Sequence, residues 1–334
     1  MRGNRLGRLA SSIIGRGPTH AFAALLRGRK YRVLFSDNEY AGLFLGVMLR
    51  CMPKRPFHVL LAHHLTPRKK RLLAKLARPG IDSLIVHSDA QRNVARSVLG
   101  FSSDAVTVLP YQVDTDFWRP LPHSKRPDLI CTAGLECRDY DTLLTAISGL
   151  EVDVRIGAAS NWSRKRNSLH GRKLPGRVAV RTYDYVSLRE LYASSAFVVV
   201  PLLEVDFQAG VTTILEGMAM GKAVIATRTS GQRDVVLGPT WMADSTDWPH
   251  DGPPVDVSTG IYTLPGDSAG LRSAIRFLLA RPDVADRLGC NGRRRVEAEF
   301  RVEQFASRFA NAISAAFPND SASPRLHISQ TPGI

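Results

Sequence analysis

Short apolar runs alternate with amphipathic segments along the first third of the chain. The runs at residues 31–35, 57–62, 83–86 and 106–109 predict strands, and the segments at 42–49, 69–77 and 90–99 predict helices. Residues 18–26 fit either a surface helix that begins at Pro18 or part of a transit peptide. Because successive parallel strands need a crossover connection, the repetition predicts an α/β layer with a parallel sheet.

A second strand and helix series follows the proline-containing run that ends at Pro127. It predicts strands at 129–132, 152–156, 178–181, 197–200 and 223–226, helices at 141–147, 188–194, 214–220, 271–279 and 302–316, and an irregular loop at 241–259. The chain is therefore expected to form two α/β domains, at 1–120 and 121–300, that face each other across a cleft. A C-terminal helix at 301–317 is expected to pack back toward the first domain, and 318–334 to form a disordered tail.

The stretch at 201–234 has the arrangement of a ligand-binding βαβ unit. A polar loop with Gly210 leads from a buried strand into a helix, and ligands of parallel sheets bind where such a loop meets a helix N-terminus. Gly210 permits close backbone approach, and the amides of Val211, Thr212 and Thr213 can point at a phosphate group. The two threonine hydroxyls either donate to the ligand or cap the helix.

Three other polar residues stand where chemistry is expected. Glu216, on an otherwise apolar helix, either accepts hydrogen bonds from a ribose diol or is a first-turn glutamate stabilised by the helix dipole. His63 follows a strand of the first domain and is next to His64. This position fits a polar ligand contact and a purely structural role about equally. Arg138 follows a strand of the second domain, where it either neutralises a pyrophosphate or pairs with Asp139 on the surface.

The charge and the cysteines narrow the choice of partners. The chain has 45 Lys and Arg against 30 Asp and Glu, a net charge of +15, so an anionic partner is expected: nucleic acid, an acidic membrane surface or a phosphorylated substrate. No recognition signature for nucleic acid accompanies this charge, and no nucleic acid partner is expected. The four cysteines form no C-x-x-C pair and no metal site is expected. The absence of a long apolar stretch predicts a cytoplasmic protein, with a peripheral contact at the inner membrane face.

Three segments resemble one protein family. Residues 109–120, LPYQVDTDFWRP, are similar to V-I-P-N-G-V-D-T-x-x-F-x-P of glycosyltransferase family 4, in the group 1 class with two Rossmann-like domains (the GT-B-type fold). Residues 201–234 resemble that family's E-G-F-G-x-x-x-x-E-A-M-A-x-G-x-P-V-I-A-T, and 288–300, LGCNGRRRVEAEF, resemble L-G-x-N-A-R-x-x-V-E-x-x-F. The resemblance also predicts that the family's opening strand and Gly-rich loop are missing from the first domain.

The resemblance implies a function and a role for each candidate residue. A sugar would pass from a nucleotide-diphosphate-sugar donor to a hydroxyl acceptor (a polysaccharide, a lipid-linked or a small molecule) with retention of configuration and without a metal or other cofactor. His63, Arg138 and Gln208 would be catalytic, while Gly210, Val211, Thr212, Thr213 and Glu216 would bind the donor. Gln208 stands where the family has the first of two glutamates, and an amide cannot act as a carboxylate base. Two alternatives remain: a nucleotide-sugar epimerase of the same fold, and a catalytically degenerate nucleotide-sugar-binding protein.

Overall fold

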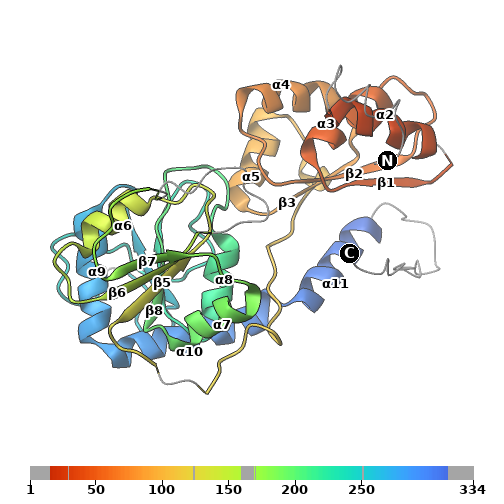
Figure 1. Ribbon diagram of the computed structural model, residues 1–334. Helices are drawn as coiled ribbons and strands as arrows, with labels where there is room; N and C mark the ends of the chain where they lie inside the picture. The colour runs from red at the N-terminus through yellow and green to blue at the C-terminus, as the bar shows by residue number, and fades with distance from the viewer. Residues whose placement is uncertain are drawn as a thin grey trace. The chain divides into compact units, whose positions relative to one another are not determined.

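The first group of apolar runs forms a four-stranded parallel sheet in the computed structural model (Figure 1). Its strands are β1 (Val33–Ser36), β2 (Phe57–Ala62), β3 (Ser83–Val86) and β4 (Val106–Val108), hydrogen-bonded in the order β1-β2-β3-β4. The structure describes residues 16–28, 30–122, 125–158, 169, 171–249 and 252–314. The predicted tail at 318–334 lies outside these residues.

The contacts divide the chain into two units. The first consists of residues 1–86, 92–109 and 306–334, and the second of residues 87–91 and 110–305. The sequence prediction put the domain boundary at residue 120, whereas the structure assigns residues 110–120 to the second unit. The C-terminal helix α11 (Val302–Ser314) reaches the first unit with its later residues, where the Phe309 ring lies 5.0 Å from that of Phe35.

The first unit contains helices before its first strand and between its successive strands. They are α2 (Arg16–Gly28), α3 (Glu39–Leu49) and α4 (Arg68–Ala77), with single 3-10 turns at Arg78–Gly80 and Ser103–Ala105. Helix α5 (Asp89–Asn93) begins in residues of the second unit and continues in the first as a π-helical turn (Val94–Val98). Right-handed crossovers between neighbouring strands place α3 and α4 on the same face of the sheet. There α2 packs on α3 and α3 packs on α4 (Figure 1). A helix therefore covers residues 18–26, as one of the two interpretations predicted.

The second unit contains a six-stranded parallel sheet in the order β10-β9-β8-β5-β6-β7. The strands are β5 (Leu129–Ala133), β6 (Asp153–Gly157), β7 (Val178–Arg181), β8 (Phe197–Val200), β9 (Val224–Thr227) and β10 (Gly260–Thr263). Strand β10 was missed by the sequence prediction because its four residues begin with a glycine and follow a long irregular segment. All four are buried, so tertiary packing rather than local pattern makes this strand.

Helices cover both faces of this second sheet. They are α6 (Tyr140–Ile147), α7 (Tyr185–Ser194), α8 (Val211–Ala219), α9 (Ser268–Ala280) and α10 (Pro282–Glu299). Alternate residues of β8 enter different apolar clusters: Val198 and Val200 pack with α7 and α8, and Phe197 and Val199 pack with α6 and α9. The predicted two α/β domains with parallel sheets are therefore present. Helix α8 begins three residues earlier than predicted, at Val211 instead of residue 214, and α3, α7 and α9 also begin three residues before their predicted starts.

Arg293, in the segment at 288–300, forms hydrogen bonds with the segment at 109–120 and with the end of α8. Its Nη1 donates to the carbonyl oxygens of Thr115 at 3.1 Å, Trp118 at 2.7 Å and Ala219 at 2.8 Å. The segment at 110–120 is thereby fixed against the end of α8. This network explains physically why the motifs at 109–120 and 288–300 occur together, because each supplies one side of the same set of hydrogen bonds.

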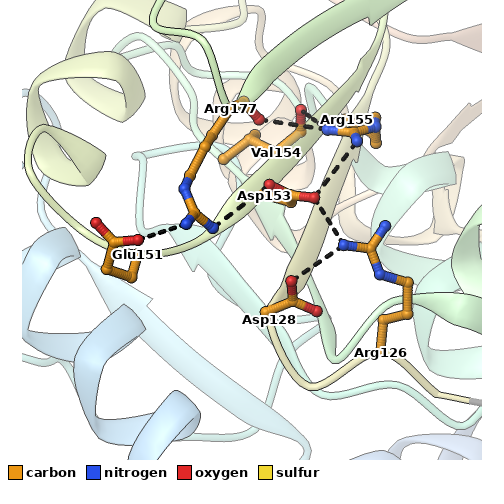
Figure 2. Close-up of polar contacts among 7 residues, drawn as sticks. All are labelled: Arg126, Asp128, Glu151, Asp153, Val154, Arg155 and Arg177. Atoms are coloured by element: carbon orange, nitrogen blue, oxygen red, sulfur yellow. Dashed lines mark hydrogen bonds and ion pairs between the residues drawn. The ribbon is translucent and has the colours of Figure 1, made fainter.

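The amino ends of the strands in the second sheet carry a network of ion pairs (Figure 2). Asp153 lies at its centre, 2.6 Å from Nη2 of Arg126, 3.5 Å from Nη2 of Arg155 and 3.7 Å from Nη1 of Arg177. Two further carboxylates, those of Asp128 and Glu151, extend the network from Arg126 and Arg177. Since ligands of parallel sheets bind at the carboxyl ends, this network lies at the edge opposite the expected site.

Candidate functional site

The central pair of strands in the second sheet marks the place where a ligand is expected. The chain passes from β5 to β6 on one side and from β8 to β9 on the other, so the connections after β5 and β8 diverge. In open parallel sheets, ligands bind beyond the carboxyl ends of the strands at such a switch point. An isolated antiparallel bridge between Arg138 and Leu202 joins the two connections there.

Arg138 lies in the connection after β5, and neutral acceptors hold its guanidinium. Nε donates to the carbonyl oxygen of Ala133 at 2.8 Å, Nη1 to that of Glu136 at 3.0 Å, and Nη2 to the Thr213 hydroxyl at 3.0 Å. Gly134 has a φ of 99°, and a Cβ atom there would lie 2.5 Å from Nη2. Only glycine leaves room for the guanidinium at this position.

The charge of Arg138 is not matched by a carboxylate. Among the described residues it takes part in no ion pair, and its hydrogen bonds go to two carbonyl groups and a hydroxyl. Burial lowers its pKa, and the groups that oppose this shift include Tyr140 and Glu216. The alternative of a pair with Asp139 is wrong, because Asp139 caps α6 and accepts from the amide of Thr142 at 3.0 Å. A guanidinium without a counter-charge suits an anionic ligand.

The N-terminus of α8 lies next to Arg138. Gly210 is its N-cap residue, in the left-handed conformation with a φ of 74°, and no side chain caps the helix. A Cβ atom on Gly210 would lie 2.8 Å from Cγ1 of Val200 and 3.2 Å from Nη1 of Arg138. The first amides of the helix, at 211–213, have no acceptor within the helix. These amides are donors available to an anionic ligand, and they lie beside a cation.

The two threonines of this helix terminus differ in their surroundings. Thr212 is exposed. Thr213 is buried, and its hydroxyl donates to the carbonyl oxygen of Ala133 at 3.3 Å while accepting from Arg138. The interpretation of these threonines as N-caps is wrong, since Gly210 occupies the cap position. The Thr213 hydroxyl positions Arg138, and its only proton is already donated within the protein.

Glu216 lies in the second turn of α8, not in the first as one interpretation supposed. Its Oε2 accepts a hydrogen bond of 3.1 Å from the Tyr192 hydroxyl on α7. Burial raises the pKa of Glu216 to about 7, although the hydrogen bond from Tyr192 and the charge of Arg138 both act to lower it. The carboxyl group is therefore close to half ionised at neutral pH.

Two glutamine side chains near the start of α8 carry buried oxygens without a donor. Oε1 of Gln208 and Oε1 of Gln232 have no hydrogen-bond partner in the described part of the chain. Gln232 is fully buried, and its Nε2 donates to the carbonyl oxygen of Ala209 at 3.3 Å. Because a buried unpaired acceptor is unfavourable by about 1–3 kcal/mol, these two oxygens are suited to ligand hydroxyl groups.

His63 belongs to the first unit, where it follows β2 with an exposed side chain. Its amide donates to Oε1 of Glu39 at 2.5 Å, and the amide of His64 donates to the same oxygen. Lys70 contacts the other oxygen of Glu39 at 2.6 Å and the carbonyl oxygen of His64 at 3.0 Å. The end of β2 is thus fixed by a buried carboxylate at the N-terminus of α3. The contact of His63 with a ligand stays a prediction.

Tyr192, Gln232 and Glu39 were not singled out from the sequence. Gln232 follows Gly231 in the stretch already identified, and that position is the only signal that could have found it. Tyr192 and Glu39 come from helices that have no motif, so only the folded chain brings them to Glu216 and to the end of β2.

Two observations concern membrane spans and metal sites, and both apply to the described residues only. No helix among them combines the length and apolar character needed to cross a bilayer. Within the same ranges, no group of three or more His, Cys, Asp or Glu side chains is arranged to hold a metal ion.

Comparisons with known proteins bear on the fold and on the second unit. Residues 126–281 match the protein family described as "Glycosyl transferases group 1". A search of curated protein sequences gave no match. Sucrose-phosphate synthase from Thermosynechococcus elongatus is similar in structure, with 20% identity over 90% of this chain and 78% of that chain and a TM-score of 0.72.

Two more solved structures show the same similarity over nearly the whole chain. HepE from Anabaena, in complex with UDP and glucose, has 16% identity over 93% of this chain and 83% of that chain, with a TM-score of 0.68. A glycosyltransferase from Rickettsia africae has 13% identity over 95% and 89%, also with a TM-score of 0.68. The predicted resemblance to group 1 glycosyltransferases and the predicted GT-B-type fold are therefore confirmed. The roles of individual residues stay predictions.

Proposed function

We propose that this chain, whose residues 126–281 match the group 1 glycosyltransferases, transfers a sugar from a nucleoside-diphosphate sugar to a hydroxyl acceptor. One observation carries the proposal: the guanidinium of Arg138, which forms no ion pair among the described residues, adjoins the uncapped N-terminus of α8 at the switch point of the sheet. A diphosphate has the charge and the acceptor oxygens that both groups lack. The HepE structures hold UDP or UDP-glucose, so uridine nucleotides are the first donors to examine.

The proposed chemistry is departure of the diphosphate from the anomeric carbon with retention of configuration. Arg138 and the amides at 211–213 stabilise the negative charge that develops on the leaving diphosphate, which is the role a metal ion has in other transferases. No metal or other cofactor is needed in this scheme. Glu216 accepts hydrogen bonds from the ribose hydroxyls through the oxygen that Tyr192 does not occupy.

The sugar itself is held by acceptor groups in this proposal. Gln208 offers a buried amide oxygen without a donor, to which a sugar hydroxyl can donate. His63 contacts the transferred sugar in this scheme, and its backbone amide donates to Glu39. The acceptor is a polysaccharide, a lipid-linked molecule or a small molecule with a free hydroxyl group.

A thermal-shift screen of nucleoside diphosphates and their sugars tests this function. A bound donor raises the unfolding temperature by mass action, and the shift persists in EDTA if no metal is required. The variant Arg138→Gln should lose most of the shift, whereas Asp153→Asn, at the opposite edge of the sheet, should keep it. The absence of a shift with every nucleotide would contradict the proposal.

Product analysis then distinguishes a glycosyltransferase from an epimerase and from a protein that only binds the nucleotide sugar. Transfer to added acceptors supports the glycosyltransferase. Conversion of the donor to an isomer without any acceptor supports an epimerase of the same fold. Donor binding with neither transfer, hydrolysis nor isomerisation identifies a nucleotide-sugar-binding protein, which is the outcome that the amide at Gln208 would explain.

A further inference from the structure

The outward face of α4 combines exposed leucines with unpaired cations. Leu72 and Leu76 lie one turn apart and are 66% and 46% exposed. Arg68, Lys69 and Lys75 are exposed on the same helix, and none of the three forms an ion pair within the described residues. The ten-residue sequence of α4, RKKRLLAKLA, contains no acidic side chain that could neutralise them.

The helix is fixed in the orientation that leaves these side chains outward. At about 100° per residue, the five exposed positions fall within an arc of about 120° centred on Leu72. The opposite arc is buried in the first unit, where Ala74 and Ala77 are fully covered. Lys70, on that side, is bound to Glu39 at 2.6 Å. The exposed leucines therefore have no route into the core of this unit.

We propose that this basic leucine face of α4 (Arg68, Lys69, Leu72, Lys75 and Leu76) docks the chain onto an anionic lipid bilayer. A surface helix with leucines at the centre and Lys or Arg at the rim inserts the apolar side chains at the boundary of headgroups and acyl chains. The cations at the rim bind lipid phosphates at the same time. The net charge of +15 attracts the whole chain to the same surface.

The composition of the face favours a bilayer over other anionic or apolar partners. Nucleic acid is bound through phosphate contacts and base edges, which would leave Leu72 and Leu76 in water. A second copy of the chain would bring two faces of the same positive charge together, which is unfavourable. A bilayer that is anionic outside and apolar just beneath satisfies both kinds of side chain.

Vesicle co-sedimentation of the full chain, without any nucleotide, tests the proposal. The wild-type chain should bind vesicles that contain phosphatidylglycerol more strongly than vesicles of phosphatidylcholine alone, and less strongly in high salt. Lys69→Glu with Lys75→Glu should weaken binding at least about 25-fold, because each cation contributes roughly fivefold. Leu72→Ser with Leu76→Ser should weaken it by about tenfold or more.

Matched controls come from the second unit. Arg276 is exposed on α9 and Val257 is 55% exposed, so Arg276→Glu with Val257→Ser makes similar changes of charge and apolar surface elsewhere. This control should bind vesicles almost as the wild type does. Leu72→Trp provides a direct readout, since insertion should shift the added tryptophan emission to the blue with anionic vesicles. Circular dichroism establishes that each variant is folded.

Four results would overturn the proposal. The first two are equal vesicle binding by the folded wild-type chain and the α4 variants, and equal binding of the wild type to neutral and anionic vesicles. The third is a change of oligomeric state on Leu72→Ser with Leu76→Ser in the absence of lipid. The fourth is that the α4 variants lose binding to a DNA duplex while they still bind vesicles. Because nucleotide is absent throughout, a failure here is distinct from a failure of the proposed transferase activity.

Discussion

The Tyr192 hydroxyl donates a hydrogen bond of 3.1 Å to Oε2 of Glu216, and so joins α7 to α8. Burial raises the pKa of Tyr192 well above its ordinary value, so the phenol stays protonated and keeps the proton that it donates to Glu216. Burial also raises the pKa of Glu216, to about 7. One oxygen of Glu216 is thus oriented by a permanent donor, while the ionisation of the carboxyl group changes near neutral pH.

The first prediction concerns the pH dependence of nucleotide binding. Ionised Glu216 accepts from two ribose hydroxyls better than the protonated acid, so the affinity for UDP should rise as the pH increases through about 7 and then level off. Glu216→Gln should remove this component. Calorimetry from about pH 6 to about pH 8.5 measures it, and the ratio of the two proteins' affinities cancels the titration of UDP itself. A pH-independent ratio would contradict the role of Glu216.

The second prediction concerns stability, through Tyr192→Phe. A folded pKa of about 7 lies above the ordinary value of 4.5, so protonated Glu216 contributes stability that is full below about 4.5 and is lost as the pH rises through about 7. Without the Tyr192 hydroxyl the pKa of Glu216 should rise further. The unfolding temperature of Tyr192→Phe should therefore keep falling above a pH of about 7, where that of the wild type levels off. Parallel curves would show that the hydroxyl does not affect the ionisation of Glu216.

The third prediction separates the electrostatic role of Arg138 from its structural role. Arg138→Lys keeps the charge, but one ammonium group cannot reach the acceptors of Ala133, Glu136 and Thr213 together. The unfolding free energy should fall by about 2 kcal/mol, and turnover should fall about a hundredfold, more than the donor affinity does. Denaturant titration and steady-state kinetics measure the two effects. An unchanged kcat would exclude Arg138 from stabilisation of the leaving group.

The sequence predicts the strands of the first unit and most strands of the second from their apolar runs, several of which are buried on both faces. Strand β2 (Phe57–Ala62), for example, reads as a continuous apolar segment and is buried along nearly its whole length. Strand β10 has no such run: it is short and starts at Gly260, and only its neighbour β9 makes it a strand. The start of α8 was placed too late because the polar threonines at 212 and 213 look like loop residues, although the left-handed Gly210 already ends the loop.

The position of the candidate site follows from the topology of the sheet and not from apolar runs. Parallel sheets place ligands at strand ends, so the loop at Gln208–Gly210 could be located by topology alone. The partners within the site depend on tertiary contacts that no local pattern encodes. The pairing of Arg138 with Asp139 was plausible because the two are adjacent, yet Asp139 caps α6 and Arg138 turns toward Thr213, 75 positions away.

The fourth prediction uses the ion-pair network at the amino ends of the strands (Figure 2). Asp153→Asn leaves Arg126, Arg155 and Arg177 without their shared carboxylate, so the unfolding temperature should fall slightly at low salt. High salt should remove much of the difference, because Arg126 and Arg177 are well exposed. Calorimetric scans at two salt concentrations measure this. UDP affinity should not change, and a large loss of affinity would contradict the placement of the site at the other edge.

The fifth prediction compares two glycines in the left-handed conformation. Gly210 has a φ of 74° and Gly149 a φ of 71°, but a Cβ atom on Gly149 would meet nothing within 4 Å. Gly149→Ala should therefore lower the unfolding free energy only by the backbone strain, about 1–2 kcal/mol. Gly210→Ala adds a Cβ atom 2.8 Å from Cγ1 of Val200, which should lower it by about 1–3 kcal/mol more.

The same pair of variants reports on the anion site, because the displacement at Gly210 also moves the first amides of α8. Gly210→Ala should weaken UDP binding at least about tenfold, since the helix-terminal amides no longer converge with Arg138 on the same oxygens. Gly149→Ala, in the turn between α6 and β6, should bind UDP as the wild type does. Denaturant titration and calorimetry on both variants make the comparison, and equal UDP affinity in the two would show that the α8 terminus does not hold the diphosphate.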